Sequence, residues 1–484
     1  MFIEDKKKTA RQLVGVEKWK RSKSYGALSN GSGILEWVGG MGKTYTAIEL
    51  IVKPYLMANK GYQIVCILIP RIELIEQWKK EVRARLGESF LDRVLIYTPH
   101  YLIQNNIQVL RVNLLVVDEL HMFYGDEFIQ YINKTKIYFE YNLGLTATFE
   151  DMSGRHKKIE SLWKVIDKID PDYALEQGFI SRFQEYNLGL ELSEEDKNAY
   201  NILSRVIGKE SGKFEPFGYH AAVKILFGGK DKNGKYFEAI AWANLWARKQ
   251  GWKPNCAPEV NDMWNPYKVI GYAKKLMTAI NTRKSFINTH SLKLSIGLAL
   301  VKRFKGIKTI TFGQDTTFTD LLHGDCLTNG IKSVVYHTVL ASRPMKDKEG
   351  EWITYQSGKK KGEVRLFGKT SLKKYAINSI RNNQADIIHT AMALDIGFDV
   401  QNMRIGLIFS RGNNFNSQKQ RGFRVYRVDP FAPDDKVLVV NIYFKGTIDE
   451  KWLANAQSKT STPIHEVETI EEIDFNPNAD KFEI

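Results

Sequence analysis

Short apolar runs that do not alternate with polar residues are the feature that most restricts how this chain can fold. The first run is Ile34–Val38, and the stretch Lys43–Asn59 after it has the length and composition of a helix. A strand buried on both faces has a continuous apolar run, and helical crossovers between such strands make them parallel. The pattern therefore predicts an α/β fold built on a parallel sheet that is covered on both faces.

This pattern occurs twice along the 484 residues, which is enough chain for two such domains. In the N-terminal half the expected strands are Ile34–Val38, Gln63–Ile69, Asn113–Val117 and Asn142–Leu145, and Glu73–Leu86 has helical spacing. In the C-terminal half the expected strands are Lys308–Phe312, Ser333–Tyr336, Ala385–His389, Ile405–Phe409 and Val437–Tyr443.

Chain of a different composition separates the two α/β regions. Trp242 and Trp246 are four residues apart, so we expect them in the core of a helical insert. For Trp252 and Trp264, near Lys253, two roles stay open: packing within the insert, or stacking on nucleic-acid bases. The division that we expect is a first α/β domain at 1–150, a linker at 151–195, an accessory insert at 196–300 leading into the second domain, a second α/β domain at 301–460 and an acidic tail at 461–484.

A further insertion lies within the second α/β region. Glu351–Tyr355 and Glu363–Phe367 flank a glycine- and lysine-rich stretch, which predicts a β-hairpin with a basic tip at Lys359–Lys361. We interpret the tip as a solvated loop, because most runs of charge are solvated. Contact with a nucleic-acid duplex, or separation of its strands, is the alternative.

The charge balance points to a polyanionic partner. Seventy Lys and Arg stand against 55 Asp and Glu, a net charge of +15, and residues 461–484 hold seven acidic residues against Lys481 alone. Residues 1–460 therefore carry +21, which suits a protein that neutralises phosphates. We interpret the tail as a solvated end, with masking of a nucleic-acid groove as the alternative.

Other classes of protein are disfavoured by composition. The three cysteines, Cys66, Cys256 and Cys326, are far apart, which argues against a zinc module or a disulfide scaffold. No apolar run is long enough to cross a bilayer, and the N-terminus lacks the apolar region of a signal peptide. We expect a cytoplasmic protein with no membrane partner, in the host cytoplasm if a phage encodes it.

A phosphate-binding loop is expected at Gly39-Gly40-Met41-Gly42-Lys43-Thr44, between a predicted strand and a predicted helix. Glycines let successive backbone N–H groups point at phosphate oxygens, and the helix N-terminus adds partial positive charge. Lys43 would reach the β- and γ-phosphates, and the Thr44 hydroxyl would bind Mg²⁺. The strict pattern has glycine at the position of Trp37.

Two carboxylates follow the apolar run that ends at Val117. Asp118 and Glu119 are expected at the carboxyl edge of the sheet, close to the phosphate loop. Asp118 would hold Mg²⁺, directly or through water, and Glu119 would orient and deprotonate the attacking water. A phosphate loop about seventy residues upstream makes this reading stronger than that of two solvated acids.

From about residue 9 to about residue 460, this ordered set of motifs resembles the superfamily 2 helicases of the DExH kind, and most of all the compact phage and restriction-type group, such as branch-migration helicases of the UvsW type. The resemblance implies two tandem RecA-like domains. It implies that Gln12 reads adenine, although Thr9 stands where the family usually has arginine. The nucleic-acid contacts that it implies are Arg71, Thr98, Thr146 and Thr148.

The second domain carries further motifs of the same kind. The segment Ile310–Gly313 resembles the motif that opens the second core. Gly397 and Asp399 are implied to face the nucleotide. Gln420, Arg424 and Arg427 lie in a segment that resembles the arginine-finger motif, and guanidinium groups suit the developing charge of the γ-phosphate. Phe423 stands where the family usually has glycine.

The resemblance implies an ATP-dependent DNA helicase or translocase that uses ATP and Mg²⁺ and acts in DNA replication, repair or recombination. Hydrolysis would require the two domains to close on the nucleotide. The expected partner is DNA that is single-stranded, forked or branched, together with replication or recombination proteins. The alternatives are an RNA helicase and a nucleotide-switched nucleic-acid-binding protein with little hydrolysis, the latter motivated by Trp37 and Phe423.

Overall fold

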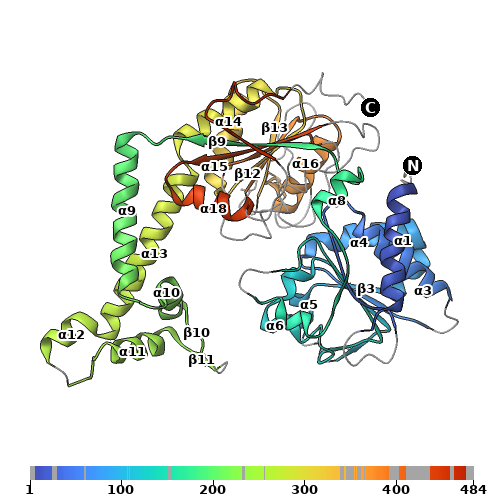
Figure 1. The fold of residues 1–484 in the computed structure, drawn as a ribbon, viewed down its shortest axis with the longest axis horizontal. Coiled ribbons are helices and arrows are strands. Elements are labelled where there is room, and N and C mark those ends of the chain that lie inside the picture. The colour runs from blue at the N-terminus through green and yellow to red at the C-terminus, as the bar shows by residue number, and fades with distance from the viewer. Residues whose placement is uncertain are drawn as a thin grey trace. The chain divides into compact units, whose positions relative to one another are not determined.

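In the computed structural model the chain folds into two compact units (Figure 1). The larger unit comprises residues 1–188, 297–443 and 450–484, and the smaller comprises residues 189–296 and 444–449. The residues that the structure describes are 6–23, 30–58, 62–105, 107, 109–150, 154–231, 235–255, 257–337, 343–344, 354, 356, 361–364, 366–391, 403–409, 436–457 and 463–475.

The first sheet has six strands in the order β3-β2-β5-β7-β1-β8, and every pairing is parallel. Its strands are β1 (Ser32–Trp37), β2 (Val65–Leu68), β3 (Val94–Tyr97), β5 (Leu114–Val117), β7 (Tyr141–Thr146) and β8 (Val165–Ile169). The four strands expected from apolar runs are confirmed. The two that were not expected, β3 and β8, lie at the edges of the sheet and have partly exposed positions.

Helices and short turns cover this sheet. The expected helix at Lys43–Asn59 is one continuous helical segment whose middle is a π-helical turn, η1. The elements are α1 (Lys6–Arg21), α2 (Lys43–Tyr45), η1 (Thr46–Val52), α3 (Lys53–Ala58), η2 (Ile72–Leu74), α4 (Ile75–Leu86), η3 (Glu88–Arg93), α5 (Pro99–Gln104), η4 (Leu120–Phe123), α6 (Asp126–Ile129), α7 (Lys157–Glu160) and α8 (Pro171–Glu176), with the small pair β4 (Leu110–Arg111) and β6 (Ile137–Tyr138).

The second sheet has seven strands in the order β13-β16-β12-β17-β18-β9-β19. Its strands are β9 (Phe183–Leu190), β12 (Thr309–Gly313), β13 (Ser333–Tyr336), β16 (Ile387–Ala391), β17 (Ile405–Ile408), β18 (Val437–Phe444) and β19 (Ile464–Val467). The accompanying helices are α14 (Ser291–Arg303), α15 (Thr316–Thr328), α16 (Lys369–Arg381) and α18 (Ile448–Gln457). All five strands expected in this half are present.

Two strands of the second sheet come from segments where no strand was expected. The stretch 151–195, expected to be a linker, contributes β8 to the first sheet and β9 to the second. Strand β19, in the acidic tail, pairs with β9, and Arg303 donates to the carbonyl oxygen of Ile473, which is fully buried. The described part of the tail, residues 463–475, is therefore folded onto the second sheet, which neither sequence interpretation of the tail anticipated.

The inserted hairpin is described only in part. Thr354 and Val364 form an antiparallel bridge, and β14 (Arg343–Pro344) pairs antiparallel with β15 (Leu366–Phe367). Of its expected basic tip, Lys359 and Lys360 lie outside the described residues, and Lys361 is exposed.

The smaller unit is mainly helical, as expected of the accessory insert. Its elements are α9 (Glu194–Gly212), α10 (Gly218–Phe227), β10 (Gly229–Lys230), β11 (Tyr236–Phe237), α11 (Ala239–Lys249), α12 (Pro258–Trp264) and α13 (Pro266–Asn288). Trp246 is buried in its core beside Phe214, and Trp242, Trp252 and Trp264 pack against that core. The core reading of Trp242 and Trp246 is confirmed, and Trp252 and Trp264 are packing residues as well.

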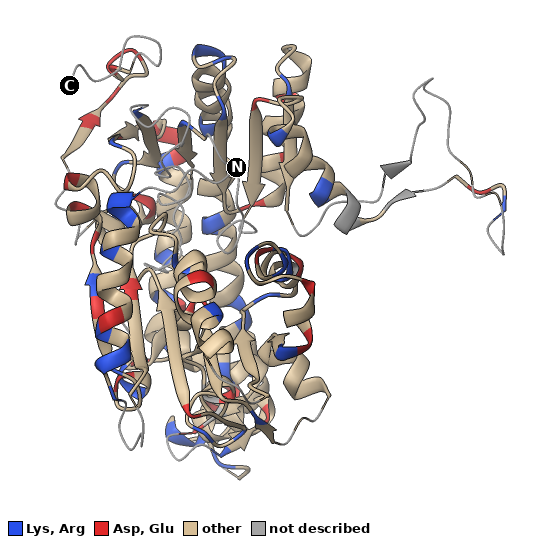
Figure 2. Cartoon of the chain, turned by 90° about the vertical axis from the view of Figure 1, so that its right-hand side faces the viewer, with Lys and Arg blue, Asp and Glu red and all other residues tan. Residues whose placement is uncertain are grey.

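Charge is carried mainly by helices and loops, and the central strands are largely uncharged (Figure 2). Among the helices that the structure describes, none is both long enough and apolar enough to cross a bilayer.

Candidate nucleotide-binding site

The glycine-rich loop leaves the carboxyl end of β1 and runs directly into α2, as expected. Gly40 and Gly42 have φ angles of 89° and 75°, in the left-handed region that favours glycine. A Cβ atom on Gly42 would lie 2.7 Å from the side-chain nitrogen of Gln12. Glycine at position 42 is thus required both by backbone conformation and by the close approach of α1.

Lys43 begins the helix, and its side chain returns toward the strand. Its Nζ donates to the carbonyl oxygens of Trp37 and Val38, at 2.9 and 3.5 Å. The ammonium is therefore held at the start of the loop, where phosphate oxygens would be stronger acceptors than neutral carbonyls. Thr44, the expected Mg²⁺ ligand, is partly buried on the first turn of the helix.

Asp118 and Glu119 follow β5 at the carboxyl end of the same sheet. The backbone N–H of Asp118 donates to the carbonyl of Leu68, and its carboxylate accepts from the indole N–H of Trp78 at 3.2 Å and from the N–H of Glu119 at 3.0 Å. Burial, then the neighbouring Glu119, raise the pKa of Asp118 to about 7, although Lys43 acts in the opposite direction. Two acids thus share a buried position with one nearby cation.

Glu119 itself has an unusual backbone. Its φ angle is 48°, and a non-glycine residue in this left-handed region is uncommon and costs on the order of 1 kcal/mol or more. Its Oε2 atom is buried, and within the described residues it has no hydrogen-bond partner. A strained residue with an unsatisfied carboxylate oxygen suits a group that acts on a bound substrate.

His121 lies between these acids and the end of β7. The Nδ1 atom of His121 lies 3.6 Å from the Glu119 carboxylate and 3.1 Å from the Thr146 hydroxyl. Burial lowers the pKa of His121, so the ring is neutral near pH 7. Because the Thr146 hydroxyl donates to the Thr148 carbonyl at 2.8 Å, His121 Nδ1 is the donor to that hydroxyl. His121 is thus hydrogen-bonded to Thr146, and its ring lies close to the Glu119 carboxylate without a hydrogen bond to it.

Gln12 lies on α1 against the loop. Its side-chain nitrogen donates to the Met41 carbonyl at 2.7 Å, while its oxygen is buried and, within the described residues, has no hydrogen-bond partner. A buried amide oxygen without a donor costs about 1–3 kcal/mol, so a ligand that supplies one would be favoured. The exocyclic amine of adenine is such a donor.

Trp37 explains the departure from the strict loop pattern. Its side chain is fully buried, and its indole N–H donates to Asp167 of β8 at 2.7 Å. Asp167 also accepts from Arg11 at 2.8 Å and from Lys18 at 2.6 Å, both on α1. A Cβ atom on Gly15 of α1 would overlap the Trp37 ring. Trp37 therefore faces α1 and β8 and does not fill the phosphate loop.

The charge of Asp167 is stabilised by these donors. Burial alone would raise its pKa, but hydrogen bonds from Arg11, Lys18 and Trp37 together hold the pKa below its usual value. The ionised carboxylate fastens α1, with Gln12, to the end of β1.

The predicted nucleic-acid contacts lie in the first domain. Arg71 precedes η2 and is partly buried, and Thr146 and Thr148 are buried at the end of β7. Thr98 is only 4% exposed, and its hydroxyl caps α5 by accepting from the N–H of Tyr101 at 3.2 Å. In this conformation the Thr98 hydroxyl is used by the fold.

The expected second-domain residues lie outside the described part of the chain. They are Gly397, Asp399, Gln420, Arg424 and Arg427, together with Phe423. The described site therefore consists of the first-domain residues alone.

Sequence reasoning missed several members of this site. His121 stands in the same short segment as Asp118 and could have been found from that position. Trp78 lies on the predicted apolar side of α4, where packing was the expected role. Asp167 is 156 residues from Arg11 and had no local signal.

The described residues fit a nucleoside triphosphate with Mg²⁺. The loop glycines, the unsatisfied oxygen of Gln12 and the unsatisfied oxygen of Glu119 are features that such a ligand would use. Among the described residues no three His, Cys, Asp or Glu side chains form a ready-made metal cage.

Comparison with known proteins agrees with this geometry. Residues 7–151 match the family described as "Type III restriction enzyme, res subunit". The chain is 26% identical over 298 residues to the "DNA 3'-5' translocase XPB2" of Sulfurisphaera tokodaii, covering 57% of this chain and 62% of that protein. The matched region thus spans less than two thirds of that relative's length. The family match contains the glycine-rich loop, Asp118 and Glu119.

Solved structures show the fold. The chain resembles S. cerevisiae Dbp5 bound to RNA and ADP BeF3, with a TM-score of 0.52 and 10% identity over 95% of this chain and 90% of that one. The Pyrococcus furiosus Hef helicase domain aligns with a TM-score of 0.46 and 13% identity over 93% and 97% of the two chains. The two parallel sheets and the Dbp5 likeness confirm the expected α/β fold with two tandem RecA-like domains and an inserted, mainly helical segment.

Proposed function

We propose that this chain is an ATP-dependent nucleic-acid motor, a DNA helicase or translocase. The observation that carries the proposal is that Lys43, the buried Asp118 and the partly buried Glu119 come together at the carboxyl edge of the first sheet. This edge lies within residues 7–151, which match a restriction-enzyme subunit family. The XPB2 relative, named a DNA translocase, supports DNA over RNA as the track.

The first-domain residues divide the work of binding and hydrolysing ATP. The loop N–H groups and Lys43 would hold the phosphates, and Gln12 would pair with adenine. Mg²⁺, held by Thr44 and Asp118, would neutralise charge on the phosphates. Glu119 would orient the attacking water and accept its proton.

The second domain would complete the reaction when the two domains close. Gly397 and Asp399 are proposed to face the nucleotide, and Gln420, Arg424 and Arg427 to supply hydrogen bonds and positive charge to the γ-phosphate. Arg71, Thr98, Thr146 and Thr148 are proposed to contact the nucleic acid. The position of His121, which is hydrogen-bonded to Thr146 and lies 3.6 Å from the Glu119 carboxylate, supports a coupling between hydrolysis and grip.

The finer assignments belong to the same proposal. They are the DExH kind, a likeness to UvsW-type phage helicases, a domain division at 1–150, 196–300 and 301–460, a cytoplasmic location and work with replication, repair or recombination proteins. The competing hypothesis of a nucleotide switch without hydrolysis rested in part on Trp37. Because Trp37 faces α1 and β8, it gives no reason to expect a defective loop.

ATP hydrolysis with and without nucleic acid tests the proposal directly. The purified chain is expected to hydrolyse ATP faster with single-stranded, forked or four-way DNA than without, and to separate strands on some of these substrates. RNA of the same shapes tests the alternative track. Hydrolysis that no nucleic acid stimulates would contradict a motor, and absent hydrolysis would contradict the site.

A further inference from the structure

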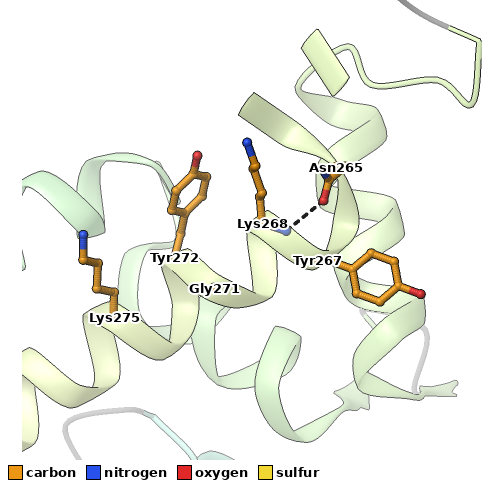
Figure 3. A pocket seen from close by; sticks show the side chains of 6 residues that line it. All are labelled: Asn265, Tyr267, Lys268, Gly271, Tyr272 and Lys275. Carbon is orange, nitrogen blue, oxygen red and sulfur yellow. Dashed lines mark hydrogen bonds between the residues drawn. The ribbon is translucent and has the colours of Figure 1, made fainter. Parts of the chain in front are cut away.

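A shallow groove lies along the first turns of α13 in the smaller unit. It has a volume of about 670 Å³ and is lined by Asn265, Tyr267, Lys268, Gly271, Tyr272 and Lys275 (Figure 3). Lys268, Tyr272 and Lys275 follow one another at four- and three-residue spacing and point to the same side of the helix. A Cβ atom on Gly271 would meet nothing within 4 Å, so no side chain fills the groove at this position.

The aromatic groups of this groove differ in their exposure. Tyr272 is anchored, since its hydroxyl donates to the Met263 carbonyl at 3.0 Å and its ring lies edge-on to Trp264. The Nζ atom of Lys213 lies 3.6 Å from the Tyr272 ring centroid and 2.7 Å from the buried Glu210 carboxylate, so its charge is paired within the fold and helps to hold the ring. Tyr267 is 79% exposed, an unusual position for a large aromatic ring that takes no part in the core.

The charge around the groove is positive. Residues 189–296 hold seventeen Lys and Arg against ten Asp and Glu, a net of +7. Lys275 is exposed, and Lys268 lies 3.8 Å from an Asp262 carboxylate that is itself 83% exposed. An exposed ion pair of this kind contributes little, so Lys268 can exchange it for a phosphate.

We propose that this groove binds the phosphodiester backbone of a single nucleic-acid strand, with Tyr267 stacking on an unpaired base. The proposal rests on the proposed motor function and names a second contact for its nucleic acid. Lys268 and Lys275 are seven positions apart, roughly 10 Å along the helix axis, so their ammonium groups can contact different phosphates of one strand. Lysines beside exposed aromatic rings are the usual construction of single-strand binding surfaces.

Two matched charge reversals on one helix test the proposal in the full chain. Lys275 and Lys284 are both exposed lysines of α13, but nine residues place them on opposite faces. Binding of a labelled thymidine oligonucleotide would be measured by fluorescence anisotropy at several salt concentrations, without ATP. Lys275→Glu should weaken binding about tenfold at low salt and lower the salt slope by about 1, whereas Lys284→Glu should stay within about twofold of wild type.

A third variant separates stacking from charge. Tyr267→Ser should weaken binding to the single strand several-fold and leave duplex binding unchanged, because only unpaired bases are free to stack. Equal binding by wild type and Lys275→Glu, or equal weakening by Lys275→Glu and Lys284→Glu, would overturn the groove while leaving the motor intact. If wild type binds no nucleic acid and none stimulates its ATP hydrolysis, the motor function itself is overturned.

Discussion

Two buried aspartates in this molecule have opposite surroundings. Asp449, in the helical unit, lies 2.6 Å from the fully buried Nζ of Lys293 and also accepts from the N–H of Phe444 at 3.3 Å. Asp118, at the edge of the first sheet, shares its position with a second acid, and burial with that acid raises its pKa to about 7. The first charge is paired within the fold, and we propose that a bound cation completes the surroundings of the second.

This difference separates a structural site from a functional one. Burying a charge is costly unless a partner and hydrogen bonds compensate it, and Lys293 supplies that compensation for Asp449. At Asp118 and Glu119 the compensation is incomplete, and Glu119 also has a strained backbone. Proteins retain such a cost where catalysis requires it. The comparison can be tested by changing each site and measuring both activity and stability.

The largest effect is expected at the functional acid. Glu119→Gln should lower ATP turnover about a thousandfold or more, because the amide cannot accept the proton of the attacking water. The free energy of unfolding should change little. Lys43→Ala, which removes the ammonium proposed to bind phosphate, should likewise lose turnover and keep its stability. Steady-state hydrolysis and urea unfolding would be measured on the same preparations, and near-normal turnover in either variant would refute the site assignment.

Changes to the buried pair Lys293 and Asp449 should affect stability rather than turnover. Lys293→Met leaves the Asp449 charge buried without its partner, so we expect a loss of about 3–5 kcal/mol in unfolding free energy. A double variant, Lys293→Met with Asp449→Leu, should recover much of that loss, because no buried charge remains. Denaturant unfolding of the two variants gives the comparison. A single variant as stable as wild type would show that the pair is not structural.

A third buried group, His389 of the second sheet, should make stability depend on pH. Burial lowers its pKa to about 3, and its Nδ1 atom lies 2.9 Å from the Thr311 hydroxyl. The unfolded state therefore binds the proton below about pH 6.5 and the folded state does not, so stability is lost as the pH falls. From pH 7 to pH 5 the loss should be about 2 kcal/mol. The unfolding free energy of His389→Gln should not show this loss between pH 7 and pH 5. If the variant has the same pH dependence as wild type, the loss does not come from His389.

The smallest effect is expected at Trp37. Trp37→Phe removes one donor to Asp167 but leaves Arg11 and Lys18 in place, so α1 and Gln12 should shift slightly. The KM for ATP should rise about threefold while kcat stays nearly constant, since adenine binding is affected and the reacting groups are not. Trp163→Phe, also at a buried tryptophan but away from α1, is the matched control. A fall in kcat at constant KM would refute this positioning role.

The four inner strands of the first sheet could be predicted, and strand β9 of the second sheet could not. The apolar runs at β1, β2, β5 and β7 were recognisable because both faces of each strand are buried. Strand β9 is also largely buried, yet it contains Glu185 and Asn187. Their side chains accept from Asn441 at 2.7 and 2.8 Å, and this compensating partner is about 250 residues away in sequence. No local pattern reveals such a pairing.

The sequence by itself determined the phosphate loop, the acidic pair and the two-sheet α/β class, because each depends on residue types within a few positions of one another. Only the tertiary structure decided that Trp37 donates to Asp167, that His121 is hydrogen-bonded to Thr146, that the acidic tail adds β19, and that Trp252 and Trp264 pack against the core of the insert while Tyr267 is exposed. These facts depend on which distant segments meet, and burial decides whether a given charge or ring is satisfied by the fold or left to bind a partner.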